Sequence, residues 1–250
     1  MTEQTNTDAP TLSRAIAHPS PARGRGARGE GANLIKAVLF DLDGTFADTA
    51  PDLGAALNHV RGLHSLPPLA PEIIRPQASH GSPGLLKLGF GIEPDAPEFP
   101  ALRLSFLDYY TAHICDHTRL FPGMAQLIDT LEQRSLPWGI VTNKPHRFTL
   151  PLMQALGYAQ RAACLISGDT CARAKPHPDP LLKAGELMGI AMQHCLYLGD
   201  DKRDIDAGRA AGTKNLIARF GYIAADADLA SWQADGTIDT PMELIAHLSL

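Results

Sequence analysis

The chain has 250 residues, of which 44% are hydrophobic and 20% are charged, and its formal net charge at pH 7 is -5. These values are typical of a globular protein large enough for one sizeable core, and the negative charge gives no indication of a nucleic-acid partner. No apolar segment approaches the roughly 20 residues that a membrane-spanning helix needs, so we expect no association with a membrane.

The first 33 residues differ in composition from the rest of the chain. Residues 1–33 are rich in Thr, Ser, Pro, Gly and Ala and contain Arg14, Arg23, Arg25 and Arg28. Such a segment buries too little apolar surface to offset the entropy that is lost when it becomes ordered. We therefore predict a disordered N-terminal extension over residues 1–33, without the apolar stretch of a secretory signal.

The four cysteines of the chain are scattered and form no Cys-x-x-Cys pair. This pattern favours reduced thiols over disulfides and makes a zinc site improbable. We predict a cytoplasmic location from these cysteines and from the lack of a secretory signal.

The first predicted element is an apolar run over residues 34–40, interrupted only by Lys36, which indicates a buried strand. It leads into Asp41-Leu42-Asp43-Gly44-Thr45. Because side chains alternate along an extended chain, Asp41 and Asp43 should emerge on one side. Two like charges this close are unfavourable without a positive charge between them. Since carboxylates and phosphate oxygens are preferred ligands of Mg²⁺, we predict a Mg²⁺ site here.

The next part of the chain predicts a small helical unit inserted behind the first strand. Helices are indicated over residues 48–62, around residues 84–88, and over a stretch where Leu102, Phe106 and Tyr109 share one face. Pro and Gly residues separate these helices, and no strand pattern is found between Asp48 and Phe121. We place the inserted unit at residues 50–118 and the main domain at residues 34–49 and 119–250.

From Phe121 onward, short apolar strands alternate with helices. Strands are indicated over residues 138–142, 163–166, 195–198 and 215–218, and helices around residues 124–131, 146–156, 180–188 and 204–212. This alternation predicts an α/β fold in which helices cover both faces of a Rossmann-like parallel sheet. Ligands of such sheets bind beyond the carboxyl ends of the strands.

Polar residues stand where four of these predicted strands end. Because the carboxyl ends of parallel strands meet at one edge of the sheet, these side chains should converge. They are Asp41 and Asp43 after the first strand, Thr142, Asn143 and Lys144 after the second, Lys175 in the loop after the third, and Asp200 and Asp201 after the fourth, with Asp204 one helical turn later.

The two acids after the first strand have complementary chemistry. Asp41 can attack phosphorus and form an aspartyl-phosphate, which divides a difficult hydrolysis into two easier steps. Asp43 is placed to protonate the leaving alcohol and later to deprotonate the attacking water.

The other strand ends supply what a transferring phosphoryl group needs. Thr142 and the backbone amide of Asn143 can donate hydrogen bonds to its oxygens, and Lys175 adds a positive charge. Mg²⁺ held by Asp41, the backbone carbonyl of Asp43 and Asp200 neutralises more. Because phosphoryl transfer depends mainly on positioning and charge neutralisation, the residues predict a phosphomonoester hydrolase acting on a small phosphorylated metabolite.

These strand-end sequences resemble the four motifs of the haloacid-dehalogenase-like hydrolases. The matching stretches are Phe40-Asp41-Leu42-Asp43-Gly44-Thr45, Val141-Thr142-Asn143, Lys175-Pro176 and Gly199-Asp200-Asp201. The helical unit lies where the phosphoglycolate-phosphatase branch of that superfamily has its cap. The resemblance therefore implies that residues 50–118 form an all-helical cap on a catalytic core.

Further stretches are similar to the N-acetylmuramic acid 6-phosphate phosphatases of peptidoglycan recycling. They are residues 101–107, 119–121, 138–145 and 220–223. The resemblance implies N-acetylmuramate 6-phosphate as the substrate, with 2-phosphoglycolate as the alternative. Pro83 stands in the cap where the resemblance leads us to expect an Arg.

Other functions and residues complete the expectations. A sugar phosphomutase shares the four motifs, whereas a non-catalytic binding module would not need the intact set of acids with Lys175. Residues expected to contact the substrate or to support the catalytic groups are Thr45, Asn143, Lys144, His80, Asp201 and Asp204. The sequence predicts no oligomeric state.

Overall fold

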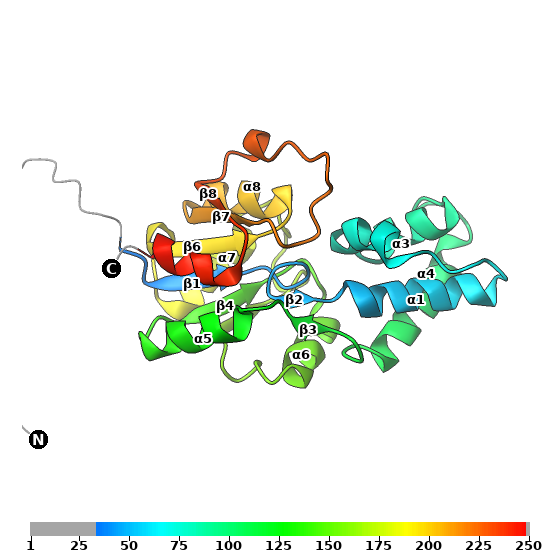
Figure 1. Ribbon diagram of the computed structural model, residues 1–250, viewed down its shortest axis with the longest axis horizontal. Helices are drawn as coiled ribbons and strands as arrows, with labels where there is room; N and C mark the ends of the chain where they lie inside the picture. The colour runs from blue at the N-terminus through cyan, green and yellow to red at the C-terminus, as the bar shows by residue number, and fades with distance from the viewer. Residues whose placement is uncertain (1–33, 249–250) are drawn as a thin grey trace, which may run out of the picture. The chain divides into compact units, whose positions relative to one another are not determined.

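The computed structural model describes residues 34–248 and is built around a six-stranded parallel sheet (Figure 1). The strand order is β5-β4-β1-β6-β7-β8. The strands are β1 (Ala37–Phe40), β4 (Trp138–Val141), β5 (Cys164–Ile166), β6 (Cys195–Gly199), β7 (Lys214–Ala218) and β8 (Gly236–Ile238). The predicted N-terminal extension lies outside the described residues.

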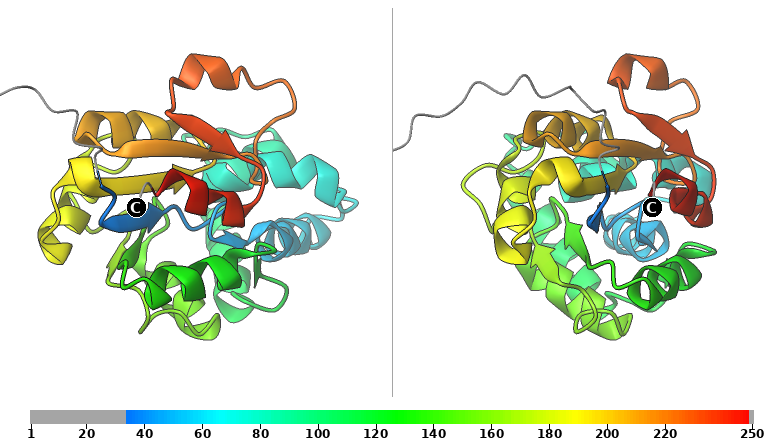
Figure 2. Two further views of the ribbon diagram at one scale, coloured as in Figure 1. Left: turned by 60° about the vertical axis from the view of Figure 1, so that its left-hand side comes forward. Right: turned by 90° about the vertical axis from the view of Figure 1, so that its left-hand side faces the viewer.

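Helices cover both faces of this sheet, as the two views in Figure 2 show. On one face, Val38 and Phe40 pack against α5 (Met124–Gln133) and α6 (His146–Ala155). On the other face, Ala37 and Leu39 pack with α7 (Asp179–Met188) and α8 (Lys202–Ala211). All four residues of β1 are buried because successive side chains point to opposite faces and both faces are covered. The predicted α/β architecture is confirmed.

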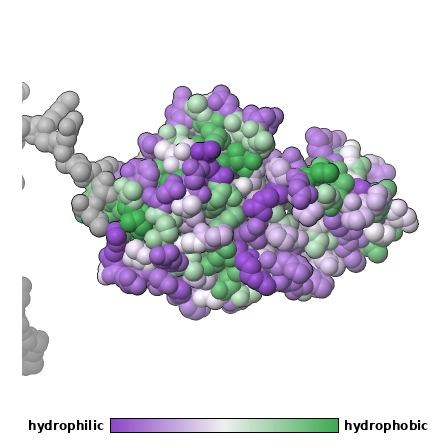
Figure 3. All heavy atoms as spheres, viewed as in Figure 1, coloured by the Kyte–Doolittle hydropathy of each residue, from purple (hydrophilic) through white to green (hydrophobic). Residues whose placement is uncertain are grey.

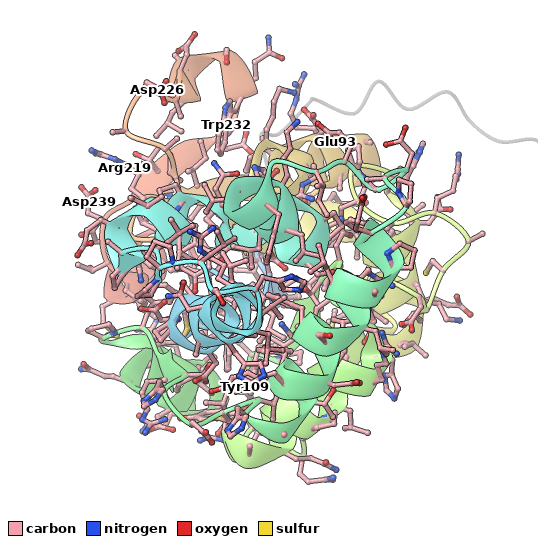
Figure 4. All side chains as sticks on the ribbon, turned by 90° about the vertical axis from the view of Figure 1, so that its right-hand side faces the viewer. Glu93, Tyr109, Arg219, Asp226, Trp232 and Asp239 are labelled. Atoms are coloured by element: carbon pink, nitrogen blue, oxygen red, sulfur yellow. The ribbon has the colours of Figure 1, made fainter. Side chains whose placement is uncertain are left out.

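Several element boundaries differ from those predicted. The first strand begins at Ala37 rather than at residue 34, and the first helix of the insert begins at Ala50 rather than at Asp48. Strand β8 was not predicted, because Gly-Thr-Ile is too short to show a periodic pattern. Beside it, Arg219 and Asp239 form an ion pair of 3.2 Å, and their side chains lie together at the edge of the view in Figure 4.

A second sheet, of two short strands, corrects the expectation that no strand lies between Asp48 and Phe121. Strand β2 (Ala47–Asp48) pairs antiparallel with β3 (Arg119–Leu120). Two residues carry no periodicity, so this pair was not visible in the sequence. The two strands carry the chain into and out of the helical insert.

The helical insert comprises all the helices between β2 and β3, and it lies beyond the carboxyl ends of the large sheet's strands (Figure 1). These elements are α1 (Ala50–Leu63), α2 (Pro71–Ile74), the 3-10 helix η1 (Arg75–His80), α3 (Gly81–Phe90) and α4 (Phe99–Ala112). They share an apolar cluster that includes Leu57, Leu85 and Phe106. The same cluster includes Phe121, Phe148 and Tyr222, so the apolar core of the insert continues into its contact with the sheet side.

The predicted inner face of α4 is wrong at one position. Leu102 and Phe106 are buried as expected, but Tyr110 rather than Tyr109 is the third buried residue of this face. Tyr109 instead stacks between His59 and His113 at ring-centroid distances of 4.3 Å, and Figure 4 shows it beside α1 and α4. The buried face therefore continues in steps of four residues, from Leu102 to Phe106 to Tyr110, whereas the prediction took a step of three after Phe106.

The surface seen in Figure 3 is a mosaic of hydrophilic and hydrophobic residues. Large exposed apolar side chains such as Leu63, Leu104 and Leu187 lie in different helices. None of the helices within residues 34–248 combines the length and the apolar character needed to cross a bilayer.

Candidate active site

A cavity of about 270 Å³ lies between the carboxyl ends of the central strands and the helical insert. Its size is close to the lower end of the range for small-molecule sites, which begins at about 300 Å³. The lining on the sheet side includes Asp41, Asp43, Thr142, Asn143, Lys144 and Lys175, and the lining on the insert side includes residues 78–83 with Arg103, Phe106, Leu107 and Tyr110. The structure thus brings together most of the sequence-predicted site residues.

Asp41 is the first residue after β1 and is almost fully buried. Its Oδ1 accepts a hydrogen bond of 2.8 Å from the backbone N–H of Leu42 and lies 2.9 Å from Lys175 Nζ. Burial raises the pKa of Asp41 to about 7, against the opposing effect of the Lys175 ammonium. Its second oxygen accepts no hydrogen bond from residues 34–248, so it is the oxygen available to an incoming group.

Asp200, at the end of β6, lies beside Asp41 and is also buried. It accepts hydrogen bonds of 2.8 Å from Thr45 Oγ1 and from the backbone N–H of Tyr222. Burial raises the pKa of Asp200 well above its ordinary value, and the negative charges of Asp41 and Asp204 raise it further. Thr45 therefore supports Asp200 and is not among the residues that line the cavity.

Three buried carboxylates form a group that fits a divalent cation. Oxygens of Asp41, Asp200 and Asp204 all lie within 4.8 Å of one another. Buried carboxylates are costly unless they are paired, and Lys175 is a single positive charge against three acids. An all-oxygen donor set of this kind suits Mg²⁺.

Both oxygens of Asp204 have hydrogen-bond partners, one of which is the buried ammonium of Lys175. Oδ1 accepts hydrogen bonds from Lys175 Nζ at 2.6 Å and from Tyr197 Oη at 3.1 Å, and Oδ2 accepts one from the backbone N–H of Asp201 at 3.0 Å. Asp201 is the N-cap of α8 and forms a capping box with Asp204. These contacts fix Asp204 at the helix start, where it holds Lys175 in place.

Asp43 lies on the same cavity as Asp41, but its carboxylate is outside the three-acid group. Its Oδ1 accepts hydrogen bonds from Thr49 Oγ1 at 2.6 Å and from Lys144 Nζ at 2.9 Å. Burial by itself lowers the pKa of Lys144, but the pKa is raised overall and the negative charge of the Asp43 carboxylate is the main cause, so Lys144 is charged. The backbone carbonyl of Asp43 as a metal ligand stays a prediction.

Lys175 is fixed by both its side chain and its backbone. Its buried ammonium contacts Asp41, Asp204, the carbonyl of Val141 at 3.0 Å and Tyr197 Oη at 2.9 Å. The Asn143 side-chain amide donates to the carbonyl of Lys175 at 2.9 Å and accepts from its N–H at 3.0 Å. The end of β4 thereby positions the loop that carries the ammonium.

Two further predicted residues line the cavity. Thr142 is buried, and its Oγ1 accepts the N–H of Lys144 at 3.1 Å, which leaves its own hydrogen free to donate into the cavity. His80 is exposed at the opposite wall, where it is the last residue of η1 before α3.

The sequence did not identify the arginines and the tyrosines around the site. Arg203 Nη2 donates to the carbonyl of Ser79 at 2.9 Å and so connects α8 to the insert. Arg103 and Tyr110 project from α4 into the cavity lining. Their spacing of seven residues is a signal for one shared helix face, but nothing in the sequence shows which face meets the sheet.

The fold and this arrangement of acids, lysine and threonine at the strand ends are those of a known class of enzymes. The chain belongs to the haloacid dehalogenase-like hydrolases, whose family profile matches residues 38–218.

Relatives with assigned activities cover nearly the same part of the chain. It is 45% identical over 211 residues to the N-acetylmuramic acid 6-phosphate phosphatase of Pseudomonas aeruginosa, which covers 84% of this chain and 93% of the relative. It is 44% identical over 209 residues to a phosphoglycolate phosphatase of Xanthomonas campestris pv. campestris, with 84% and 94% covered.

Solved structures show the same fold. The crystal structure of a predicted phosphoglycolate phosphatase from Haemophilus somnus has a TM-score of 0.76 at 24% identity and covers 85% of this chain and 97% of that chain.

Proposed function

We propose that the protein is a Mg²⁺-dependent phosphomonoester hydrolase that works through an aspartyl-phosphate on Asp41. The observation that carries this proposal is the placement of Asp41 and Asp43 on one cavity, with Lys175 Nζ 2.9 Å from Asp41 Oδ1. A nucleophile, an acid/base and a positive charge thus surround one space of small-molecule size.

In the first step, an oxygen of Asp41 forms a bond to phosphorus while the bond from phosphorus to the ester oxygen breaks. Asp43 gives its proton to the leaving oxygen, which departs as the alcohol. In the second step, water attacks the phosphorus, Asp43 takes a proton from that water, and the bond between Asp41 and phosphorus breaks to release phosphate.

The surrounding residues stabilise the charge on the transferring group. Thr142 Oγ1 and the N–H of Asn143 donate hydrogen bonds to its oxygens, while Lys175 offsets negative charge beside Asp41. Asp41, Asp200 and the backbone carbonyl of Asp43 would hold Mg²⁺, which neutralises further charge on the phosphoryl oxygens.

Lys144 has a part in this scheme because it binds Asp43 in the structure, with 2.9 Å between Nζ and Oδ1. A phosphate in the cavity offers the Lys144 ammonium a second anionic partner. The substrate thereby weakens the ion pair between Lys144 and Asp43. Asp43 can then carry the proton that it needs to act as the acid.

The helical insert, with boundaries at residues 50–118, serves as a cap in this proposal. Its α4 contributes Phe106 and Tyr110 to the cavity wall, and both side chains are almost fully buried. An apolar wall of this kind excludes water from the phosphoryl group, which strengthens the electrostatic contacts within the site.

The substrate that we propose is N-acetylmuramate 6-phosphate, and 2-phosphoglycolate is the second candidate. The relative from Pseudomonas aeruginosa carries the first activity in its name and the relative from Xanthomonas campestris the second, at 45% and 44% identity. A cytoplasmic location fits the four free cysteines.

Specificity constants measured with Mg²⁺ across N-acetylmuramate 6-phosphate, 2-phosphoglycolate and hexose phosphates test the substrate. We expect the first compound to give the highest kcat/KM, and equal, poor hydrolysis of all of them would reject the substrate. The Asp41→Asn variant tests the mechanism, because an amide lacks the nucleophilic carboxylate that forms the acyl phosphate, and hydrolysis retained in it would reject covalent catalysis.

A further inference from the structure

One face of α4 forms a continuous part of the cavity wall. Arg103, Phe106, Leu107 and Tyr110 all line the cavity, and steps of three, four and seven residues place them on the same side of a helix. Seven residues correspond to a rise of about 10.5 Å, so Arg103 and Tyr110 leave the helix about two turns apart along this wall.

Tyr110 marks the catalytic end of this wall. Lys144 Nζ, which binds Asp43, lies 4.8 Å from the centre of the Tyr110 ring. Among the buried side-chain nitrogens and oxygens of residues 34–248, Tyr110 Oη is the only one without a hydrogen-bond partner. Burial raises the pKa of Tyr110 to about 12, so this hydroxyl keeps its proton and is both a donor and an acceptor. A buried hydroxyl that lacks a partner is costly, and a bound molecule in the cavity can supply one.

Arg103 marks the other end of the same wall. Its Nε donates to Ser82 Oγ at 3.3 Å, and within residues 34–248 it forms no ion pair. Two other arginines near the site do form ion pairs, Arg203 with Asp201 and Arg75 with Asp48, both at 2.7 Å. Of the two arginines that line the cavity within residues 34–248, Arg203 is paired with a carboxylate and Arg103 is not.

We propose that Arg103 binds a carboxylate on the part of the substrate that is remote from the phosphate, while the Tyr110 hydroxyl bonds a polar atom next to the scissile ester. A guanidinium presents two parallel N–H groups to a carboxylate, which gives this contact both strength and orientation. The inference rests on the proposed phosphatase function and defines its substrate class.

The length of the wall selects among acidic substrates. In 2-phosphoglycolate only an oxygen and one carbon separate the phosphorus from the carboxylate, a span shorter than the two helical turns between Tyr110 and Arg103. A sugar phosphate that carries a carboxylate on another ring position has the required length. Pro83, at which the family resemblance suggested an Arg, lines the same region, so Arg103 supplies the guanidinium from α4 instead.

Two sugar phosphates isolate the contact that we propose. N-acetylglucosamine 6-phosphate is N-acetylmuramate 6-phosphate without the lactyl ether and its carboxylate. In the Arg103→Met variant we expect kcat/KM for the muramate to fall roughly 10- to 100-fold, the loss typical of a charged hydrogen-bonded contact, and kcat/KM for the glucosamine to change less than about twofold. Arg103→Lys should recover part of the loss.

Two other variants serve as comparisons. Arg147→Met removes an exposed positive charge near the site from a residue that does not line the cavity, and it should leave both substrates unchanged. Tyr110→Phe should lower kcat/KM for both sugars by the same factor, because the atom next to the scissile ester is common to them. A thermal unfolding transition measured for each variant serves as the check that the variant is folded.

Equal losses on the two sugars in Arg103→Met, or no loss on either, would overturn the role of Arg103. A direct binding measurement separates this outcome from a failure of the proposed function. Calorimetric titration of Asp41→Asn with each sugar phosphate, with and without Arg103→Met, should show the same selective loss of affinity. If the wild-type enzyme hydrolyses no phosphomonoester, the proposed function fails, and these affinities still decide whether Arg103 reads the carboxylate.

Discussion

At the scale of single residues, the two acids of the first strand are kept apart by their partners. Asp41 contacts Lys175 and shares a buried space with Asp200, whereas Asp43 contacts Lys144 and Thr49. The different partners suit different tasks, since a nucleophile must stay ionised beside positive charge and an acid/base must exchange a proton.

The acid/base task of Asp43 predicts a dependence on the leaving group. In Asp43→Asn, an alkyl phosphate should lose about 100-fold or more in kcat, because no group protonates the departing alkoxide. With p-nitrophenyl phosphate the phenolate leaves without a proton, so a rapid burst of p-nitrophenol should precede slow turnover. Stopped-flow absorbance measures the burst. A normal steady-state rate on the alkyl phosphate would remove the acid/base role of Asp43.

Gly44 is required at its position for two reasons that act together. Its φ of +83° is a left-handed conformation, and a Cβ there would overlap the carboxylate of Asp200 and the ring of Tyr222. We expect Gly44→Ala to lower the free energy of unfolding by about 1–3 kcal/mol and to weaken Mg²⁺ binding.

A matched glycine provides the control for this substitution. Gly62 lies in α1, and a Cβ added there meets no atom within 4 Å. Gly62→Ala should therefore leave stability unchanged or raise it by up to about 1 kcal/mol. Urea denaturation compares the two variants, and an equal effect of both would show that Asp200 does not constrain residue 44.

At the scale of elements, the sequence predicted those strands and helices that bury a full apolar pattern. The residues of β1, β4 and β6 are buried on both faces, and each gave an uninterrupted apolar run. Strands β2, β3 and β8 have two or three residues and depend on a partner strand for their conformation, so local sequence does not indicate them.

The sequence likewise predicted one part of the candidate site and missed another. Asp41, Thr142, Lys175 and Asp200 could be placed together because strand ends of a parallel sheet meet at one edge. The contribution of α4 could not, because an isolated amphipathic pattern does not show which partner its face will meet. Tyr109 and Tyr110 are neighbours of the same type, and only the packing of α4 against the sheet side distinguishes them.

The start of α8 links helix stability to the site. Asp201 accepts a hydrogen bond from the backbone N–H of Arg203 at 2.8 Å, as an N-cap does. Asp201→Ala should lower the free energy of unfolding by about 1 kcal/mol, the usual value for a lost N-cap. Asp206→Ala removes a partly exposed acid of the same helix that pairs only with Lys202, and it should cost at most about 0.5 kcal/mol. Equal effects in urea denaturation would show that the cap is not important.

At the scale of the whole described chain, the sheet and the helical insert meet in contacts that surround the cavity. Tyr222, after β7, accepts a hydrogen bond from the N–H of Ala50 at 2.8 Å and donates one to Asp48 at 2.9 Å. Arg75 of the insert pairs with Asp48 at 2.7 Å, and its guanidinium lies 4.9 Å from the Tyr222 ring centre. The sheet side and the helical insert, both of which line the cavity, are therefore joined by hydrogen bonds and an ion pair as well as by apolar contacts.

The buried acids at this junction also give the stability of the metal-free protein a defined dependence on pH. Burial raises the pKa of Asp41 to about 7 and that of Asp200 well above its ordinary value. The folded state then binds protons more tightly than the unfolded state, whose carboxyl groups titrate near pH 4. The contribution of such groups to the free energy of unfolding is fully present below about pH 4, and it is lost as the pH rises through 7.

Mg²⁺ should reverse this loss, because it takes the place of the protons on the acids. We expect Tm to be several degrees higher in 5–10 mM Mg²⁺ than in EDTA at pH 8, and about equal in the two at pH 5. The size of the rise depends on the ratio of the Mg²⁺ concentration to Kd. Because Mg²⁺ and EDTA are compared at the same pH, the effects on Tm of titrating groups elsewhere in the chain cancel. Asp200→Asn should abolish the rise, and a rise that is larger at pH 5 than at pH 8 would contradict a metal site made of these buried carboxylates.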